Sequence, residues 1–300
     1  MIDSSAIVQG DRDRPYSDRH VQVVTVHPGA WVSKVNGFVL DLAGLVSERM
    51  NDGRVLVIDL SGDLGEARGW PYPARDAAFQ ALSRSLAAGT MSATELQESV
   101  YPIDGFPQVD LLPLGPAERE TYALGGLVGW RLAREIMRAA RGAWAMAFVV
   151  ASSMRSRSMI QTAFMDGARF HLELGESFYE DDRLMSGIWR ERRARITVIS
   201  TFRALAGRAK RQEWAAWLWA LGGSGYPGFL SADVGIEPGD VSLVRYVRER
   251  LPSVAHSSQL PIAFRAQTLW AHRWEFRSYW GLQRLANRLA GQLTASISQA

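Results

Sequence analysis

Val21-Gln-Val-Val-Thr-Val26 opens the stretch of sequence that decides the fold. This strand-like run leads into a loop, His27-Pro-Gly-Ala-Trp-Val-Ser-Lys-Val-Asn36, and then into a helical pattern over 37–50. A turn, Asn51-Asp-Gly53, precedes a second apolar run, Arg54-Val-Leu-Val-Ile-Asp-Leu60. Strand, loop, helix, turn and strand make a βαβ unit, and a lysine at the end of its first loop is typical of a phosphate-binding site.

The residues of this loop suit phosphate binding poorly. Such a loop needs glycines, because its backbone N–H groups wrap closely around phosphate oxygens. Its lysine lies at the start of the following helix, and a hydroxyl beside it contacts Mg²⁺. Lys34 has the position of that lysine, but Val35 follows it without a hydroxyl, and Trp31 stands where a glycine is expected. The context predicts a phosphate site, and the residues predict a degenerate one.

Lys34 is one of only two lysines in the chain, the other being Lys210. All other basic side chains except histidine are arginines, as in a GC-rich genome where lysine drifts to arginine wherever either serves. Retention of Lys34 then indicates a site that a guanidinium is too broad to fill, such as a phosphate cradle. The alternative is that Lys34 survived by chance.

Composition narrows the class of protein. The 300 residues are 47% apolar and 22% charged, which is ordinary for a soluble globular protein. The net charge of +3 implies no strong field over the whole molecule, so any role with nucleic acid depends on local arginine clusters. The absence of cysteine excludes disulfides, thiolate metal sites and cysteine nucleophiles. No secretory signal opens the sequence and no apolar run approaches a membrane span, so a cytoplasmic protein is expected.

The rest of the sequence alternates strand-like and helical patterns. We expect a flexible N-terminal arm over 1–19 and a single domain over 20–300. Its central strands are predicted at 21–26, 54–60, 144–150 and 195–200, with further strands at 109–114 and 169–174. Helices are predicted at 76–97, 117–141, 158–165, 181–191, 203–221, 241–251 and 265–293. The first of these is broken near Gly89, with Ser92 or Thr94 as a possible cap, and 252–261 is expected to be irregular. The pattern predicts an α/β fold of three layers, with helices on both faces of a mostly parallel sheet.

The order of these segments resembles the ParA/MinD family of deviant P-loop ATPases over about residues 20–295. The run Arg54-Val-Leu-Val-Ile-Asp-Leu60 is similar to the family's second strand, and Val109-Asp-Leu-Leu-Pro-Leu-Gly115 is similar to its third. The apolar run over 144–153 stands where the family has a strand ending in Asp-Thr-Pro, and the family also closes with a long helix. The resemblance implies a P-loop NTPase-like fold of ParA/MinD type.

The resemblance implies a nucleotide site, with ATP and Mg²⁺ as cofactors where the loop is competent. Its residues in this sequence are Gly29, Ser33, Lys34, Val35 and Asp59. Several family groups are replaced. Gly29 stands in place of the lysine that crosses an ATP-sandwich dimer, and Ser61 in place of the aspartate that orients the attacking water. Ala151 or Ser152 replaces the Mg²⁺-associated aspartate. No catalytic residue and no metal site are predicted, and histidine spacing indicates none.

These replacements favour a pseudo-ATPase with a degenerate Walker A loop. Phosphoryl transfer depends on positioning and charge neutralisation, and the groups that provide them are missing. We therefore expect a non-catalytic positioning, partitioning or regulatory scaffold that acts through a protein partner or a homodimer. The alternative is an active ParA-type partition ATPase that binds ATP and non-specific DNA. A third possibility is an accidental resemblance and some other α/β protein.

Arginine clusters at 189–195 and 203–211 carry the DNA hypothesis. In the family, basic surface patches hold DNA through its phosphates without reading its sequence. The candidate contacts are Arg203, Arg208, Lys210 and Arg211. An equal alternative is a solvated face in which Glu191 and Glu213 are interleaved with the arginines.

The last predicted helix mixes aromatic and apolar residues with arginines. MinD-like relatives use a C-terminal amphipathic helix at membranes, so a peripheral membrane contact is one interpretation. The stripe of Trp270, Trp274, Phe276, Tyr279, Trp280, Leu285 and Leu289 favours docking against the core instead. The tryptophans over 214–280 are also compatible with a partner interface.

Trp31 decides whether the loop is a ligand site. Glycine is tolerated against phosphate because it has no Cβ, and tryptophan cannot follow that path without strain. We predict that Trp31 covers the phosphate site or packs over the carboxyl edge of the sheet, and that Lys34 pairs with Asp59 or a nearby carbonyl. The alternative is a bulged loop in which Ser33 and Lys34 still hold an anion at the helix N-terminus.

Overall fold

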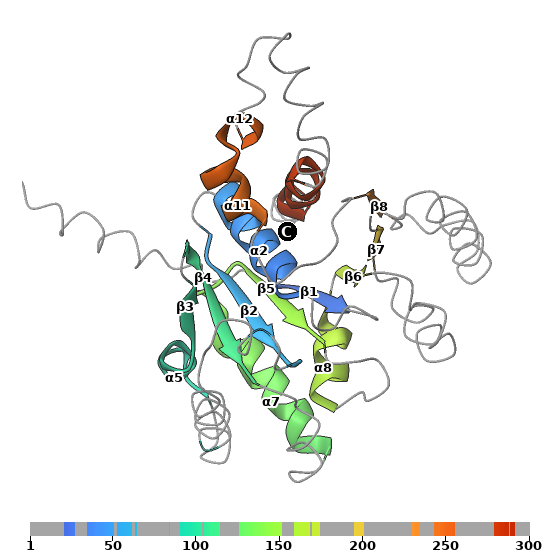
Figure 1. The fold of residues 1–300 in the computed structure, drawn as a ribbon. Helices are drawn as coiled ribbons and strands as arrows, with labels where there is room; N and C mark the ends of the chain where they lie inside the picture. The colour runs from blue at the N-terminus through green and yellow to red at the C-terminus, as the bar shows by residue number, and fades with distance from the viewer. Residues whose placement is uncertain are drawn as a thin grey trace, which may run out of the picture.

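The structure is a computed structural model of the 300-residue chain (Figure 1). It describes residues 21–27, 35–50, 53–61, 64, 84, 91–103, 105–114, 126–151, 159–168, 170–174, 195–200, 230–233, 243–255, 279–287 and 289–291. The expected arm at 1–19, the predicted helices at 181–191 and 203–221, and the loop 28–34 lie outside these residues.

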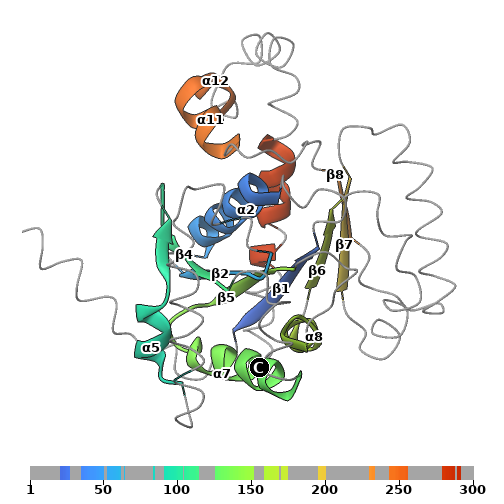
Figure 2. The same ribbon diagram turned by 60° about the horizontal axis from the view of Figure 1, so that its bottom comes forward.

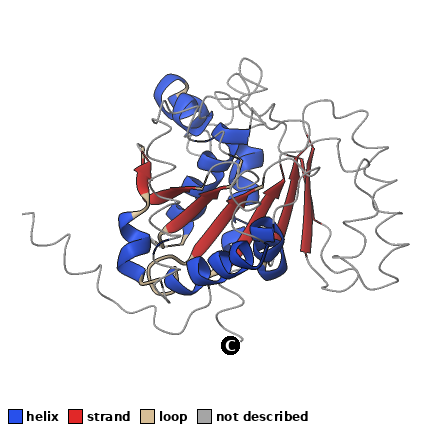
Figure 3. Cartoon of the chain, turned by 90° about the horizontal axis from the view of Figure 1, so that it is seen from below, coloured by secondary structure: helices blue, strands red, loops and turns tan. Residues whose placement is uncertain are grey.

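One eight-stranded sheet forms the centre of the described fold, in the order β3-β4-β2-β5-β1-β6-β7-β8 (Figure 3). The strands are β1 (Gln22–His27), β2 (Val55–Asp59), β3 (Tyr101–Ile103), β4 (Phe106–Pro113), β5 (Met146–Val150), β6 (Phe170–Leu174), β7 (Arg195–Ser200) and β8 (Leu230–Asp233). Every pair is parallel except β3 with β4, which is antiparallel. The four predicted central strands are confirmed, as are those predicted near 109–114 and 169–174.

Helices cover both faces of the sheet (Figure 2). One layer contains α2 (Val35–Arg49), α11 (Leu243–Arg250), α12 (Pro252–Ala255) and the helical residues 279–287 and 289–291, called here the C-terminal helix. The other contains α5 (Ala93–Glu98), α7 (Gly126–Ala139) and α8 (Met159–Gly167). The predicted three-layer α/β fold is confirmed.

The alternation of side chains along the strands produces two cores. Val55 and Val57 of β2 belong to the core under α2, whereas Leu56 and Ile58 belong to the core under α7 and α8. This is the two-residue period of a strand, and a strand buried on both faces is apolar at every position. All five residues of β2 and all five of β5 are buried, which explains their uninterrupted apolar runs.

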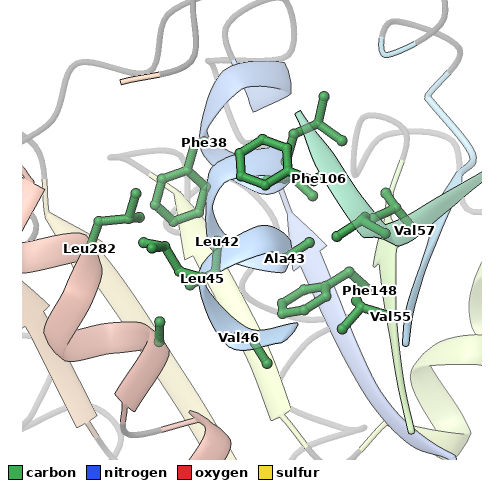
Figure 4. Close-up of a cluster of buried hydrophobic side chains, with 14 of the residues drawn as sticks. Phe38, Leu42, Ala43, Leu45, Val46, Val55, Val57, Phe106, Phe148 and Leu282 are labelled. Carbon is green, nitrogen blue, oxygen red and sulfur yellow. The ribbon is translucent and has the colours of Figure 1, made fainter. Parts of the chain in front are cut away.

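Helix α2 packs closely on the sheet. Figure 4 shows it between Leu282 of the C-terminal helix and Val55, Val57 and Phe148 of the strands. A Cβ built on Gly44 would lie 2.1 Å from Cδ1 of Phe106, at the start of β4. Glycine at this position therefore lets the helix approach the Phe106 ring.

Local signals explain several element boundaries. Ser92 caps α5 in a capping box, since its Oγ accepts from Glu95 N at 3.1 Å while Glu95 Oε2 accepts from Ser92 N at 2.6 Å. The predicted cap at Ser92 is confirmed. The expectation of an irregular 252–261 is wrong at its start, because Pro252 opens the short helix α12, and proline suits a first helical turn. Strand β5 begins at Met146 rather than at Trp144.

The C-terminal helix docks against the core. Tyr279, Leu282, Leu285, Ala286 and Leu289 are buried in the same cluster as α2. For the described residues of this helix, the predicted docking against the core is confirmed. None of the helices within the described residues combines the length and hydropathy that crossing a membrane requires.

Candidate functional site at the carboxyl ends of the central strands

The carboxyl ends of β1, β2 and β5 meet at one edge of the sheet. Asp59 is in register with Val150, which is in register with Val26. Backbone hydrogen bonds continue past the strands, because Leu60 N donates to Val150 O at 3.0 Å and Ala151 N donates to Val26 O at 2.9 Å. Ligands of open α/β sheets generally bind at such an edge, and the position predicted for the site lies there.

Asp59 ends β2 at this edge and is fully buried. Its Oδ1 accepts hydrogen bonds from Ser61 N at 2.9 Å and from Ser61 Oγ at 2.6 Å, and its Oδ2 accepts from Leu64 N at 3.2 Å. Buried carboxylates require such donors, because desolvation without them is costly. Asp59 thus anchors the segment that follows β2.

Ser61 is a residue whose role the sequence interpretation missed. It was treated as the loss of a water-orienting aspartate, but its hydroxyl and its backbone N–H both donate to Asp59. An Asp-x-Ser sequence directly after a buried strand is the signal that could have indicated this turn, since aspartate side chains often accept from the backbone two residues on.

The other predicted nucleotide-site residues lie mostly outside the described residues. Gly29, Ser33 and Lys34 belong to the loop 28–34, and Val35 is the first residue of α2. Since β1 ends at the carboxyl edge, α2 begins beside that edge, where a helix N-terminus attracts anions. The structure therefore brings Val35 and Asp59 to the same edge. The hypotheses on Trp31 and on pairing of Lys34 remain predictions.

Ala151 follows β5 directly and is buried. Its methyl group offers no oxygen to a cation, and Ser152 lies outside the described residues. Within the part of the chain that the structure describes, no three histidine, aspartate or glutamate side chains gather as metal ligands would. The DNA candidates Arg203, Arg208, Lys210 and Arg211 also lie outside it.

Polar side chains join α2 to the helices beside it. Asp41, which is buried, accepts from Val244 N at 3.2 Å at the start of α11, and Glu48 forms two hydrogen bonds to Arg248 at 2.8 and 2.9 Å. The hydrogen bonds that Arg248 donates to Glu48 raise the pKa of Arg248, although burial opposes this. The sequence interpretation missed these contacts.

Arg49 ties the end of α2 to the C-terminal helix. Its guanidinium donates to Asn287 Oδ1 and Gln283 Oε1, and its Nη1 donates to Leu45 O at 2.6 Å. Burial lowers the pKa of Arg49, and the nearby Glu48 opposes this. The helix that starts at the candidate site is therefore held along its length by two segments from the end of the chain.

Comparison with known proteins finds similarity to solved structures only. No family model and no curated protein matches the chain. Among solved structures, cobyrinic acid a,c-diamide synthase from Mycobacterium smegmatis, with bound ADP and magnesium, is 13% identical, with a TM-score of 0.52 over 80% of this chain and 98% of that one. The ATP complex of a McdA variant from Cyanothece is 12% identical, with a TM-score of 0.50 over 91% of this chain and 97% of that one. This chain has the ParA/MinD-type P-loop NTPase fold.

The MinD cell division protein of Aquifex aeolicus is also similar, at 14% identity and a TM-score of 0.49 over 90% of this chain and 97% of that one. Identities this low establish the fold alone, so the chemistry of the site must be argued from its residues.

Proposed function

We propose that this protein is a positioning or partitioning protein of the ParA/MinD fold that acts as a non-catalytic scaffold through partner contacts. The observation that carries the proposal is that the Asp59 carboxylate accepts hydrogen bonds from the segment that follows its own strand. Its carboxylate accepts from Ser61 and Leu64 and so orders the protein's own backbone. A carboxylate committed in this way is a poor cation ligand.

The side chains at the described part of this edge favour a site without a magnesium ion. Mg²⁺ requires near-octahedral oxygen coordination, usually including one or two carboxylates. Ala151 and Val35 provide no side-chain oxygen at the end of β5 and at the start of α2. Phosphoryl transfer relies on the metal and on positioned charge, so this arrangement favours a protein without turnover. Any nucleotide held by Lys34 would then stay bound without being hydrolysed.

A second candidate is an active partition-type ATPase that works on non-specific DNA. It is favoured by the fold shared with McdA, solved as an ATP complex, and with a synthase solved with ADP and magnesium. Lys34, directly before α2, is the residue that such an enzyme would use to hold phosphate.

Phosphate release without DNA tests the two candidates. The scaffold predicts no Mg²⁺-dependent release above the blank from the unmodified protein. Turnover that disappears in Lys34→Ala and persists in Lys210→Ala would overturn it in favour of the ATPase. Lys210 is the matched control, because it is the only other lysine in the chain.

A further inference from the structure

Helix α7 buries one face and exposes another that is rich in arginine. Leu132, Ala133, Ile136 and Ala139 pack into the core on its side of the sheet. Every exposed residue between 129 and 141 is an arginine: Arg131, Arg134, Arg138 and Arg141. Burial of the apolar face does not require arginines on the opposite face, since alanine or glutamate would serve a solvated helix face as well.

One stripe of this face alternates cations with apolar side chains. Trp130, Arg134 and Met137 follow each other at helical spacing, and Arg141 continues this spacing just after the helix. The backbone N–H of Arg141 donates to Arg138 O at 3.3 Å, which joins it to the last turn of α7. Trp130 and Met137 are half-buried, and the two arginines are exposed. The stripe extends over about 16 Å of helix axis.

The arginines of this face differ in their contacts. Arg138 donates from Nε and Nη2 to Glu135 Oε2 at 2.9 and 2.6 Å, and from Nη2 to Met91 O at 2.6 Å. The guanidinium groups of Arg134 and Arg141 form no hydrogen bond or ion pair with the described part of the chain. Within the described residues, Arg138 is therefore engaged in structure, whereas the two arginines of the stripe are not.

We propose that the stripe of Trp130, Arg134, Met137 and Arg141 docks an acidic amphipathic helix of a partner protein. Protein interfaces are enriched in tryptophan, methionine and arginine, and the stripe consists of these three residue types. The guanidinium groups match carboxylates in bidentate geometry. Trp130 and Met137 alternate with the two arginines along the stripe and supply apolar contact surface for a partner. The proposal does not depend on the nucleotide loop.

The surroundings disfavour a nucleic acid or a membrane as occupant. Nucleic-acid sites neutralise several phosphates with uncompensated cations, about 6–10 in strong binders, whereas the stripe provides two. The main apolar face of α7 is packed on the sheet, so it cannot enter a lipid surface.

A labelled synthetic helix tests the proposal on the full chain. The probe is a 15-residue peptide with leucines and glutamates alternating on one face, and its partner probe has glutamine in place of each glutamate. Fluorescence anisotropy at low salt measures binding to the unmodified protein, to Arg134→Glu with Arg141→Glu, and to the control Arg250→Glu with Arg284→Glu. The control makes the same charge change at exposed arginines in the opposite helix layer.

We expect the glutamate peptide to bind and the glutamine peptide to bind at least about tenfold more weakly. The α7 variant should lose at least about tenfold in affinity, and the control should stay within about twofold. Circular dichroism checks that both variants fold. The proposal would be overturned if the glutamate peptide did not bind or if the two peptides bound equally well. It would also be overturned if both variants lost the same affinity for the glutamate peptide. Binding of a duplex DNA that needs Arg134 and Arg141, without peptide binding, would overturn it in favour of a nucleic-acid surface.

Discussion

Two buried aspartates on neighbouring strands, Asp110 of β4 and Asp59 of β2, are stabilised in different ways. Asp110 is 4% exposed, and its Oδ2 accepts from Arg54 Nη2 at 2.6 Å and from Trp144 Nε1 at 2.7 Å. The Arg54 guanidinium also lies 5.3 Å from the centroid of the Trp144 ring. Asp59 instead accepts from the backbone and hydroxyl of the segment after its own strand.

The difference separates a carboxylate that links distant segments from one that orders a local segment at the carboxyl edge of the sheet. Asp110 is in register with Leu56 and joins the residues before β2 and β5 across the amino ends of the strands. Its partners are distant in sequence, so losing it damages tertiary packing. Asp59 bonds within five residues, so losing it should free a local segment at the carboxyl edge.

The largest effect should come from Asp110→Ala. The change leaves the buried indole N–H of Trp144 without its acceptor and Arg54 without its counter-ion. Removing a partner from a buried pair costs about 3–5 kcal/mol, and the 38% exposure of Arg54 reduces this to about 2–3 kcal/mol. Urea unfolding measures the loss. A loss no greater than that of Asp59→Ala would contradict the structural role assigned to Asp110.

A test from the other face of β4 is Gly44→Ala. The new methyl would overlap the Phe106 ring, and overpacking of this kind costs about 1–3 kcal/mol. Gly291→Ala is the control, because nothing lies within 4 Å of a Cβ there, and it should be neutral or slightly stabilising. Equal melting temperatures for the two variants would show that α2 does not depend on this close approach.

Asp59→Ala should cost less, about 1–2 kcal/mol, because its lost bonds belong to one short segment. Hydrogen exchange should accelerate at the amides of Ser61 and Leu64 and change little in β4. Asp59→Asn keeps one acceptor oxygen, so its stability should lie between that of the unmodified protein and that of Asp59→Ala. Unchanged exchange at both amides would contradict the role of Asp59 as an anchor.

Local and periodic signals carried most of the fold prediction. The continuous apolar runs of β2 and β5 correctly indicated strands buried on both faces, and Ser92, one of the two possible caps, correctly indicated a helix start. The hairpin strand β3 was missed, because Tyr101-Pro-Ile103 is three residues long and contains a proline. Leu230–Asp233 was missed for its similar shortness.

The site was harder to predict, because its contacts depend on chain reversal and on distant segments. The pattern named Asp59 and the carboxyl edge of the sheet, whose role in ligand binding stays a prediction, and it did not indicate the hydrogen bonds that Ser61 donates to Asp59. The contact of Asp41 with Val244 joins residues 203 apart in sequence, and no periodicity reports such a pair. A buried aspartate in an apolar helix was the only signal available, and it does not name its partner.

The smallest effect should come from Glu135→Gln, which tests an exposed counterpart of the Arg54–Asp110 pair. Glu135 accepts from Arg138, whose side chain is 47% exposed, and pairs of this kind contribute about 0–1 kcal/mol. The hydrogen bond from Arg138 lowers the pKa of Glu135 below its usual 4.5. A lowered carboxyl pKa stabilises the folded protein above the unfolded value, and this contribution is lost as pH falls through the folded pKa. The difference in unfolding free energy between the unmodified protein and Glu135→Gln should therefore be small at pH 7 and shrink further below pH 4.5. A difference as large as that of Asp110→Ala, or one that grows on acidification, would show that burial is not what distinguishes the two ion pairs.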